Sequence, residues 1–357
     1  MKTKIKVNSF KHLAILIFAS ALFSACGSLN VSNKTITYKT HFIGKSVNGA
    51  HSRAVYITDM FVVAAGQKGN LGVHIMDTTN RTPHIQDSIP NIEDFRDIYL
   101  NNRGNCMLMN SGENGIIYGV SRGTQKMVLY DTAGVFLDGM SFWEDQTGIV
   151  FGDPINGKFF LAKSTNQGLK WSALTPKTMP NVLENEAGFA ASGTSIQTLE
   201  DSTVYFGTGM GSKARLFCSY DRGENWIVKD TPMRAGDSYG IYTMYFWSKD
   251  EGLILGGSYK DSTYKKGICQ FTKDGGDSWE ARTNGLLGYC SGVHGTANGE
   301  LIVATGRMGT FYTTTQGQTW DVLVERAYYS CFVTEKRIAL VGRNGATEIL
   351  NYTLSEK

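Results

Sequence analysis

The chain has 357 residues, of which 41 are glycine, 6 are proline and 11% are aromatic. This composition is typical of short strands joined by tight turns, and it argues against a mainly helical protein. The formal net charge of +3 is small and comes from lysines near the N-terminus. It therefore gives no reason to expect nucleic-acid binding.

The first 25 residues have the pattern of an export signal. Four lysines between Lys2 and Lys11 precede an apolar stretch, Leu13 to Phe23, that is too short for a comfortable membrane span. Because these four lysines leave with the signal, the formal net charge changes from +3 to −1. The small residues before Cys26 resemble a bacterial lipoprotein signal, in which the cysteine is lipidated and begins the mature chain. An ordinary secretory signal with an unrelated cysteine is the alternative.

A lipidated Cys26 would anchor the mature chain to a membrane. We therefore expect a lipid-anchored protein of the bacterial cell envelope, at the outer membrane and facing the periplasm. Residues 26–34 are short and mostly polar, and they are predicted to form a tether. The next segment, Thr35 to Gly44, has the character of a strand.

Seven similar units follow this segment. Each consists of an apolar strand, a short turn and a second apolar strand that ends in or next to glycine. These glycines recur about every 40 to 50 residues, which is the length of a propeller blade. They are Gly66, Gly112, Gly152, Gly207, Gly256, Gly306 and Gly342.

The units predict an all-β fold, a seven-bladed β-propeller over residues 35–357. Their apolar runs are nearly continuous, as expected of sheets that are covered on both faces. The last unit has room for about three strands, one fewer than a propeller blade holds. We expect Thr35–Gly44 to supply its outer strand, which would close the ring and cover the open edge.

Four of the units share a hairpin motif, Ser/Thr-x-Asp-x-Gly-x-x-Trp. In it the hydroxyl and carboxylate bond the local backbone, glycine supplies a positive φ, and tryptophan fills a gap against the neighbouring blade. The motif resembles the Asp-box of bacterial-neuraminidase-type repeats, with Asn166 and Thr315 in place of aspartate in two copies. We expect a structural role for its residues: Ser164, Gly168, Trp171; Ser219, Asp221, Gly223, Trp226; Thr272, Asp274, Gly276, Trp279; Thr313, Gly317 and Trp320.

The five cysteines after Cys26 lie within or beside apolar, strand-like runs. They are Cys106, Cys218, Cys269, Cys290 and Cys331. No C-x-x-C pair occurs, and no histidine is close enough for a zinc pattern. Buried free thiols are the interpretation we favour, although an exported protein could pair two of them. No metal or other cofactor is predicted.

Polar residues are predicted to gather at one mouth of the central channel. The start of each first strand and the loop after each second strand face this mouth, whereas the Asp-box hairpins face the other. Charges in such a concave site suit an anionic or sugar-like ligand, or a protein loop. Ion pairs that only join neighbouring blades are the alternative. The candidates are Arg53, Arg96, Asp97, Asp138, Asp153, Glu186, Arg307 and Arg343.

The order of several motifs is similar to that in a bacterial lipoprotein family with photosystem II assembly-factor-like propellers. These motifs are FRDI at Phe95–Ile98, FLDGMSFW, the stretch Asn185–Ile196, YFGTG and LILGGSY. The resemblance covers Arg53 to Gly342, and it implies action through binding other proteins. Members of this family are often described as oxidoreductases, but GTGMGSK at Gly207–Lys213 lacks the spacing of a dinucleotide loop.

Two functions follow as hypotheses. The first is a membrane-tethered binding or assembly scaffold whose partner, a protein or an anionic small molecule or glycan, binds at the polar channel mouth. The second is a carbohydrate-active enzyme, a glycoside hydrolase or polysaccharide lyase, with its site at the same mouth. An enzyme needs an acid and a base that converge on one bond, and the fold cannot decide this.

Overall fold

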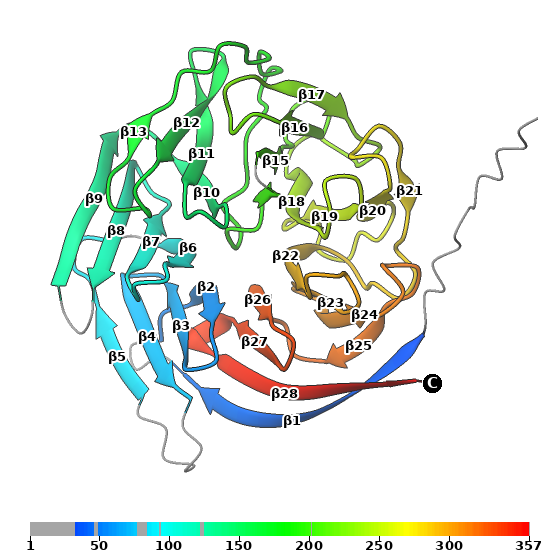
Figure 1. Ribbon diagram of the computed structural model, residues 1–357. Helices are drawn as coiled ribbons and strands as arrows, with labels where there is room; N and C mark the ends of the chain where they lie inside the picture. Colours follow the sequence, from blue (N-terminus) through cyan, green and yellow to red (C-terminus); the bar gives the residue numbers. More distant parts are fainter. Residues whose placement is uncertain are drawn as a thin grey trace, which may run out of the picture. The chain divides into compact units, whose positions relative to one another are not determined.

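The described chain forms seven four-stranded antiparallel sheets arranged as the blades of a ring (Figure 1). The computed structural model describes residues 33–45, 49–76, 84–92, 94–121, 125–200 and 202–356. Within these residues the only helical element is a short 3-10 turn, η1 (Arg343–Gly345). The predicted seven-bladed β-propeller is thus confirmed. The predicted signal segment and Cys26 lie outside the described residues.

Blades 1 to 3 each run outward from the channel in chain order. Blade 1 consists of β2 (Ser52–Ile57), β3 (Phe61–Gly66), β4 (Asn70–Ile75) and β5 (His84–Ser88). Blade 2 consists of β6 (Phe95–Leu100), β7 (Cys106–Asn110), β8 (Asn114–Ser121) and β9 (Gln125–Ala133). Blade 3 consists of β10 (Leu137–Phe142), β11 (Gly148–Ile155), β12 (Lys158–Ser164) and β13 (Ser172–Ala173).

Blades 4 to 6 repeat this order. Blade 4 consists of β14 (Ile196–Leu199), β15 (Thr203–Gly207), β16 (Arg215–Ser219) and β17 (Ile227–Asp230). Blade 5 consists of β18 (Tyr239–Phe246), β19 (Gly252–Ser258), β20 (Cys269–Thr272) and β21 (Glu280–Ala281). Blade 6 consists of β22 (Cys290–Gly295), β23 (Ile302–Gly306), β24 (Gly309–Thr313) and β25 (Asp321–Val324).

Blade 7 combines the two ends of the described chain. Its strands β26 (Ser330–Val333), β27 (Arg337–Val341) and β28 (Thr347–Glu356) come from the C-terminal part, and its outer strand is β1 (Lys34–Gly44). β1 pairs antiparallel with β28 from Lys34 opposite Glu356 to Gly44 opposite Thr347. The ring closes as predicted, with the strand beginning one residue before the expected Thr35.

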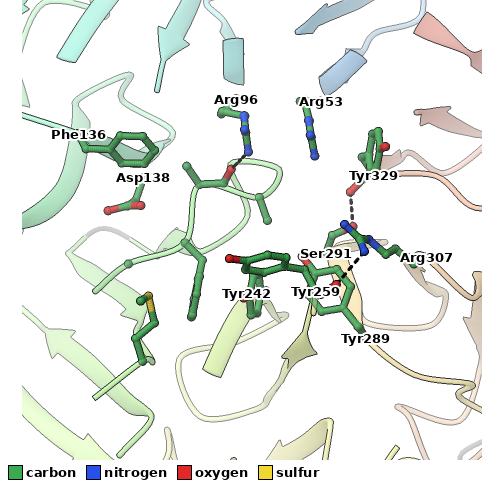
Figure 2. Close-up of a pocket in the computed structure, with 15 residues that line it drawn as sticks. Arg53, Arg96, Phe136, Asp138, Tyr242, Tyr259, Tyr289, Ser291, Arg307 and Tyr329 are labelled. Carbon is green, nitrogen blue, oxygen red and sulfur yellow. Dashed lines mark hydrogen bonds between the residues drawn. The ribbon is translucent and has the colours of Figure 1, made fainter. Parts of the chain in front are cut away.

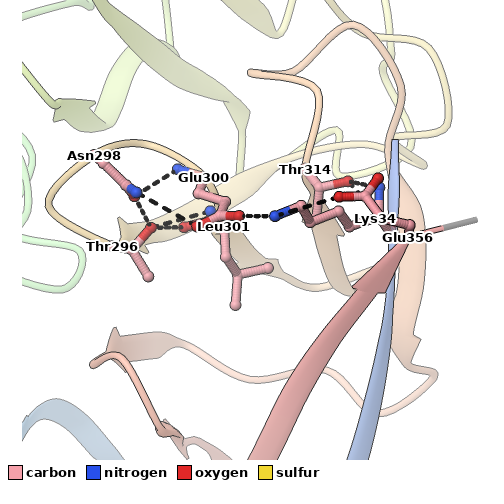
Figure 3. A network of polar contacts seen from close by, with 7 residues as sticks. All are labelled: Lys34, Thr296, Asn298, Glu300, Leu301, Thr314 and Glu356. Atoms are coloured by element: carbon pink, nitrogen blue, oxygen red, sulfur yellow. Dashed lines mark hydrogen bonds and ion pairs between the residues drawn. The ribbon is translucent and has the colours of Figure 1, made fainter. Parts of the chain in front are cut away.

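Lys34, the first residue of β1, also ties blade 7 to blade 6 (Figure 3). Its backbone N–H donates to Thr314 Oγ1 at 3.0 Å, and the same hydroxyl donates back to the Lys34 carbonyl at 3.1 Å. The Lys34 ammonium pairs with Glu300. These contacts hold the closing strand in register at the end where a terminal strand would otherwise fray.

Neighbouring blades are held together by buried apolar side chains. Within the described residues, seven apolar clusters lie between the seven pairs of adjacent blades. Between blades 3 and 4, Phe206 stacks on Phe151 with ring centroids 4.6 Å apart. Burial of each such side chain contributes about 1.5–3 kcal/mol to the free energy of unfolding. Packing between neighbouring blades therefore stabilises the ring.

The four tryptophan hairpins share one backbone hydrogen bond. In each, the hydroxyl that begins the motif accepts the backbone N–H of the motif glycine, at 2.8 to 3.0 Å. In the hairpin of blade 4, the Trp226 indole N–H donates to the Gly223 carbonyl at 2.9 Å. The same ring packs 5.0 Å from Phe206 in the cluster shared with blade 3. The turn is thus locked by its own polar groups, and its tryptophan faces the preceding blade.

The five cysteines among the described residues are all buried and unpaired. Burial raises the pKa of the Cys106 and Cys290 thiols to about 12. These thiols are therefore protonated and act as small apolar side chains.

Candidate functional site

Five of the seven innermost strands carry a β-bulge close to their first residue. In each bulge one residue is left out of the pairing with the second strand of the blade, and a bulge redirects that side chain. Each of these five side chains lines the same cavity. They are Arg53, Arg96, Asp138, Tyr242 and Ser291, from blades 1, 2, 3, 5 and 6.

This cavity, the mouth pocket, has a volume of about 520 Å³ and opens at one end of the channel. Figure 2 shows arginines and tyrosines facing one another across it, with Asp138 and Phe136 on one side and Arg307 and Tyr329 on the other. Each of blades 1 to 6 contributes to the lining, and Tyr329, in the link that precedes blade 7, completes it. Its other residues are Gly188, Phe189, Ala190, Ala191, Met210, Tyr259 and Tyr289.

A segment between blades 3 and 4 crosses the channel and forms the floor of the mouth pocket. This crossing segment comprises residues 186–195. Residues 188–191 line the mouth pocket, and residues 192–194 line a second cavity of about 250 Å³, the channel chamber. The channel chamber is lined by residues further along the innermost strands, including Tyr56, Tyr99 and His294. The crossing segment therefore divides the channel into two compartments.

Contacts with four other blades hold the crossing segment in place. Arg96 of blade 2 donates to the Ala190 carbonyl, and Ser192 donates to the Ser291 carbonyl of blade 6 at 2.7 Å. The backbone of Thr194 accepts the Met244 N–H of blade 5 at 2.8 Å. The Gly188 N–H donates to Asp153 of blade 3 at 3.2 Å. A segment bonded on four sides makes a fixed floor rather than a mobile lid.

The arginines of the mouth pocket differ in how much of their bonding capacity is used. Arg96 Nε lies 2.8 Å from Asp94 Oδ2, and its guanidinium also holds the crossing segment. The Arg53 Cζ atom lies 4.3 Å from the centroid of the Tyr329 ring. Arg53 Nε is 3.8 Å from Asp94 Oδ2, a longer contact than that of Arg96. Burial and the nearby Arg96 charge lower the Arg53 pKa. Arg307 is exposed and donates to the Tyr259 carbonyl at 2.8 Å.

Asp138 is the least compensated polar group of the pocket. Its side chain is buried, and neither carboxyl oxygen has a hydrogen-bond partner within the described residues. Burial raises the Asp138 pKa well above its ordinary value, and the nearby Asp153 charge raises it further. Gly188 allows the approach, because a Cβ there would lie 2.4 Å from Asp138 Oδ2. Orphaned buried carboxyls are rare in folded proteins and point to a ligand or a catalytic role.

Four of the eight predicted site residues come together in the mouth pocket: Arg53, Arg96, Asp138 and Arg307. Asp97 lies on the other side of the crossing segment, in the channel chamber. Its carboxylate accepts the backbone N–H groups of Ile98 and Met140, each at 2.8 Å, and joins blades 2 and 3. Burial raises the Asp97 pKa to about 8, although these two bonds oppose the shift.

The other three predicted residues lie around the mouth pocket but do not line it. Asp153 is behind Asp138, where it bonds Gly188. Glu186 is buried against Arg215 of blade 4. Arg343 lines a third cavity of about 670 Å³, the side pocket, together with Arg326 and His51. Arg307 and Tyr329 line both the side pocket and the mouth pocket.

Several lining residues were not among the predicted candidates. The sequence carries one signal for Tyr242 and Ser291: each of the five bulged residues stands two positions before a buried apolar residue of its innermost strand. These apolar residues are Val55, Ile98, Met140, Met244 and Val293. Phe136 and Phe189 carry no such signal.

The described residues hold neither a metal-binding cluster nor a membrane-spanning helix. No group of three or more histidine, cysteine, aspartate or glutamate side chains is arranged to hold a metal ion. No helix in the described part of the chain has the length and apolar character needed to span a membrane.

Comparisons with known proteins identify a fold and a partial relative. No family model matches the chain. A stretch of 116 residues is 31% identical to the photosystem II assembly lipoprotein Ycf48 of Synechococcus sp. (strain CC9902), and it covers 31% of this chain and 31% of that relative. The match thus spans less than a third of the relative's length. Among solved structures, the WD40 β-propeller domain of Doa1 is similar with a TM-score of 0.63 at 11% identity, covering 88% of this chain and 97% of that one.

Proposed function

We propose that this protein is a membrane-tethered scaffold of the bacterial cell envelope that binds a protein partner at the mouth-pocket face of its propeller. The observation that carries the proposal is the alignment of five bulges on one cavity. A bulge interrupts the strand pairing and is common beside active sites, and these five all turn a side chain into one cavity. The partial similarity to an assembly lipoprotein supports a protein as the partner.

The residues around the mouth pocket suit such an interface. Tyrosine, methionine and arginine are enriched where proteins bind one another, and the rim presents Tyr259, Met210 and Arg307 to solvent. An arginine-rich rim favours a partner with an acidic surface. The tether is proposed from the N-terminal pattern that ends at Cys26.

The alternative, a carbohydrate-active enzyme, has weaker support. Two-carboxylate glycosidases place a second carboxyl group about 5–9.5 Å from the first. Among the described residues that line the mouth pocket, Asp138 is the sole carboxyl group, and there is no histidine. Asp153 does not line the pocket, and its carboxylate accepts the Gly188 N–H. An acid and a base that converge on one bond are thus not in evidence in this pocket.

Site-specific photocrosslinking in cells tests the scaffold proposal. A photoreactive residue replaces Tyr259 at the rim or, as the control, Tyr38 on the outer strand β1; their exposed fractions are 42% and 41%. We expect a discrete protein adduct from position 259 that is absent from position 38 and lost in the Arg307→Glu background. Equal crosslinking at both positions, or adducts indifferent to Arg307, would overturn the proposal.

A further inference from the structure

We propose that the mouth pocket also binds a sugar acid, a hydroxylated ring bearing a carboxylate, with the carboxylate at Arg53 and Arg307 and ring hydroxyls at Asp138. This inference goes beyond the scaffold function, because it concerns the interior of the pocket and needs no protein partner. It rests on polar groups that line the pocket and whose hydrogen-bonding capacity the described residues do not fill.

The first observation is the unused carboxyl of Asp138. Its two oxygens are buried, lack partners among the described residues and lie on a cavity wall. An unpaired buried polar group costs about 1–3 kcal/mol, and a ligand that bonds it recovers this cost. A hydroxyl group both donates and accepts, so it bonds a carboxyl group in either protonation state. The raised pKa of Asp138 favours such a neutral partner over an ammonium group.

The second observation is the pair of arginines with spare donors. Arg96 is bound to Asp94 and to the crossing segment, which leaves Arg53 and Arg307 as the freer cations. A guanidinium carries five N–H donors in a fork that matches a carboxylate. Arg53 has its Nε without a hydrogen-bond partner within the described residues. Within the described residues, Arg307 donates one hydrogen bond, to the Tyr259 carbonyl.

The arrangement of these groups selects the ligand. Figure 2 shows Asp138 and Arg307 on opposite sides of the pocket, so one ligand must carry its anion at one end and its hydroxyls at the other. Aromatic faces line the space between them, including Phe189 stacked on Tyr242 and Tyr289 edge-on to the same ring. A volume of about 520 Å³ is far larger than inorganic phosphate requires and accepts one or two sugar rings.

An acidic peptide fits the interior less well. Its carboxylates would suit the arginines, but a further carboxylate close to Asp138 and Asp153 would add like charge to a buried site. A sugar acid brings hydroxyls to that end instead. The pocket therefore favours the sugar acid, and the peptide becomes an outcome of the test.

Calorimetric titration of the purified full-length protein in detergent tests the inference. The probes are D-glucuronate and D-galacturonate, with glucose lacking the carboxylate, cyclohexanecarboxylate lacking the hydroxyls, and an acidic peptide for comparison. We expect at least one uronate to bind at least tenfold more tightly than glucose and the peptide. Arg307→Gln should weaken uronate binding at least tenfold, whereas Arg343→Gln, which alters the side pocket alone, should leave it unchanged.

Asp138→Leu separates the two ends of the ligand. It should weaken the uronate at least fivefold and leave cyclohexanecarboxylate unaffected, because only the uronate offers hydroxyls. Arg307 is exposed, so its variant keeps the test valid even if the Asp138 variant does not fold. Absence of uronate binding, equal binding by Arg307→Gln, or tighter binding of the peptide would overturn the inference. The crosslinking experiment at position 259 tests the scaffold proposal independently, so either proposal can fail while the other holds.

Discussion

Glu186, the first residue of the crossing segment, forms a two-pronged ion pair with Arg215 of blade 4. Arg215 Nε donates to Glu186 Oε1 at 2.8 Å, and Arg215 Nη2 pairs with Oε2. Thr208 donates to the same carboxylate at 2.6 Å. Glu186 is 4% exposed, so this carboxylate is a buried anchor of the pocket floor rather than part of the channel mouth.

Breaking this pair should be costly. Glu186→Ala leaves the Arg215 guanidinium buried without its counter-ion, which costs about 3–5 kcal/mol. Chemical denaturation measures the loss, with Glu184→Ala, an exposed neighbour, as the control that should change stability little. The double variant Glu186→Leu with Arg215→Met should recover much of the loss, because it removes both charges. A single variant as stable as the control would contradict the anchor role.

The hydroxyl of the tryptophan hairpin offers a second test of stability. Ser219→Ala removes the acceptor of the Gly223 N–H and leaves that buried donor unpaired, which costs about 1–3 kcal/mol. The matched control is Thr37→Ala, whose hydroxyl bonds Thr353 on the exposed outer edge of blade 7. Urea denaturation should separate the two variants clearly. Equal midpoints would show that the hairpin hydroxyl does not hold the turn.

Repetition made the fold predictable. Each blade supplies the same strand pair and closing glycine, and the spare strand at Thr35–Gly44 has no partner other than the edge of the last blade. Arg53 and Arg96 were also predictable as mouth residues, because each stands at the start of a first strand. Such inferences need only strand order and chain direction, which an apolar period reveals.

Side-chain direction was the part that the sequence could not supply. Arg96 and Asp97 are neighbours, yet successive strand residues point to opposite sides, and a bulge decides which one faces the mouth pocket. The crossing segment was equally hidden, because Asn185–Ile196 has no strand period and is held by partners from distant blades. The sequence wrongly placed Glu186 at the channel mouth for the same reason. Its partner Arg215 lies further along the chain, in blade 4, and no local pattern links the two residues.

The lipid anchor remains a prediction for residues outside the described structure. Cys26→Ser should abolish lipidation and move the protein from the membrane fraction to the soluble fraction, because the acyl chains supply the membrane affinity. Fractionation with intact-mass measurement checks both consequences. Cys106→Ser, a buried thiol, is the matched control and should leave the protein in the membrane fraction. A membrane-bound Cys26→Ser protein of otherwise unchanged mass would contradict the lipoprotein assignment.

The buried carboxyl of Asp138 should give stability a specific dependence on pH. Its pKa is raised in the folded state, so the folded protein keeps a proton that the unfolded chain releases above the ordinary pKa. The contribution of Asp138 to the free energy of unfolding is therefore largest at low pH, and it decreases as the pH rises towards the folded-state pKa. Asp138→Asn cannot titrate and should lose none of its stability in this way.

Thermal melting between pH 4 and pH 8 measures the difference between the two proteins. Asp97 and Asp94 also have raised pKa values, but they are present in both proteins and largely cancel in the comparison. Asp153 interacts with Asp138, so the difference reports the titration of this carboxyl pair. We expect the melting temperature of Asp138→Asn, relative to the natural protein, to rise steadily as the pH increases. A difference that is constant with pH, or that becomes smaller, would mean that Asp138 is ionised in the fold and has a partner that compensates its charge.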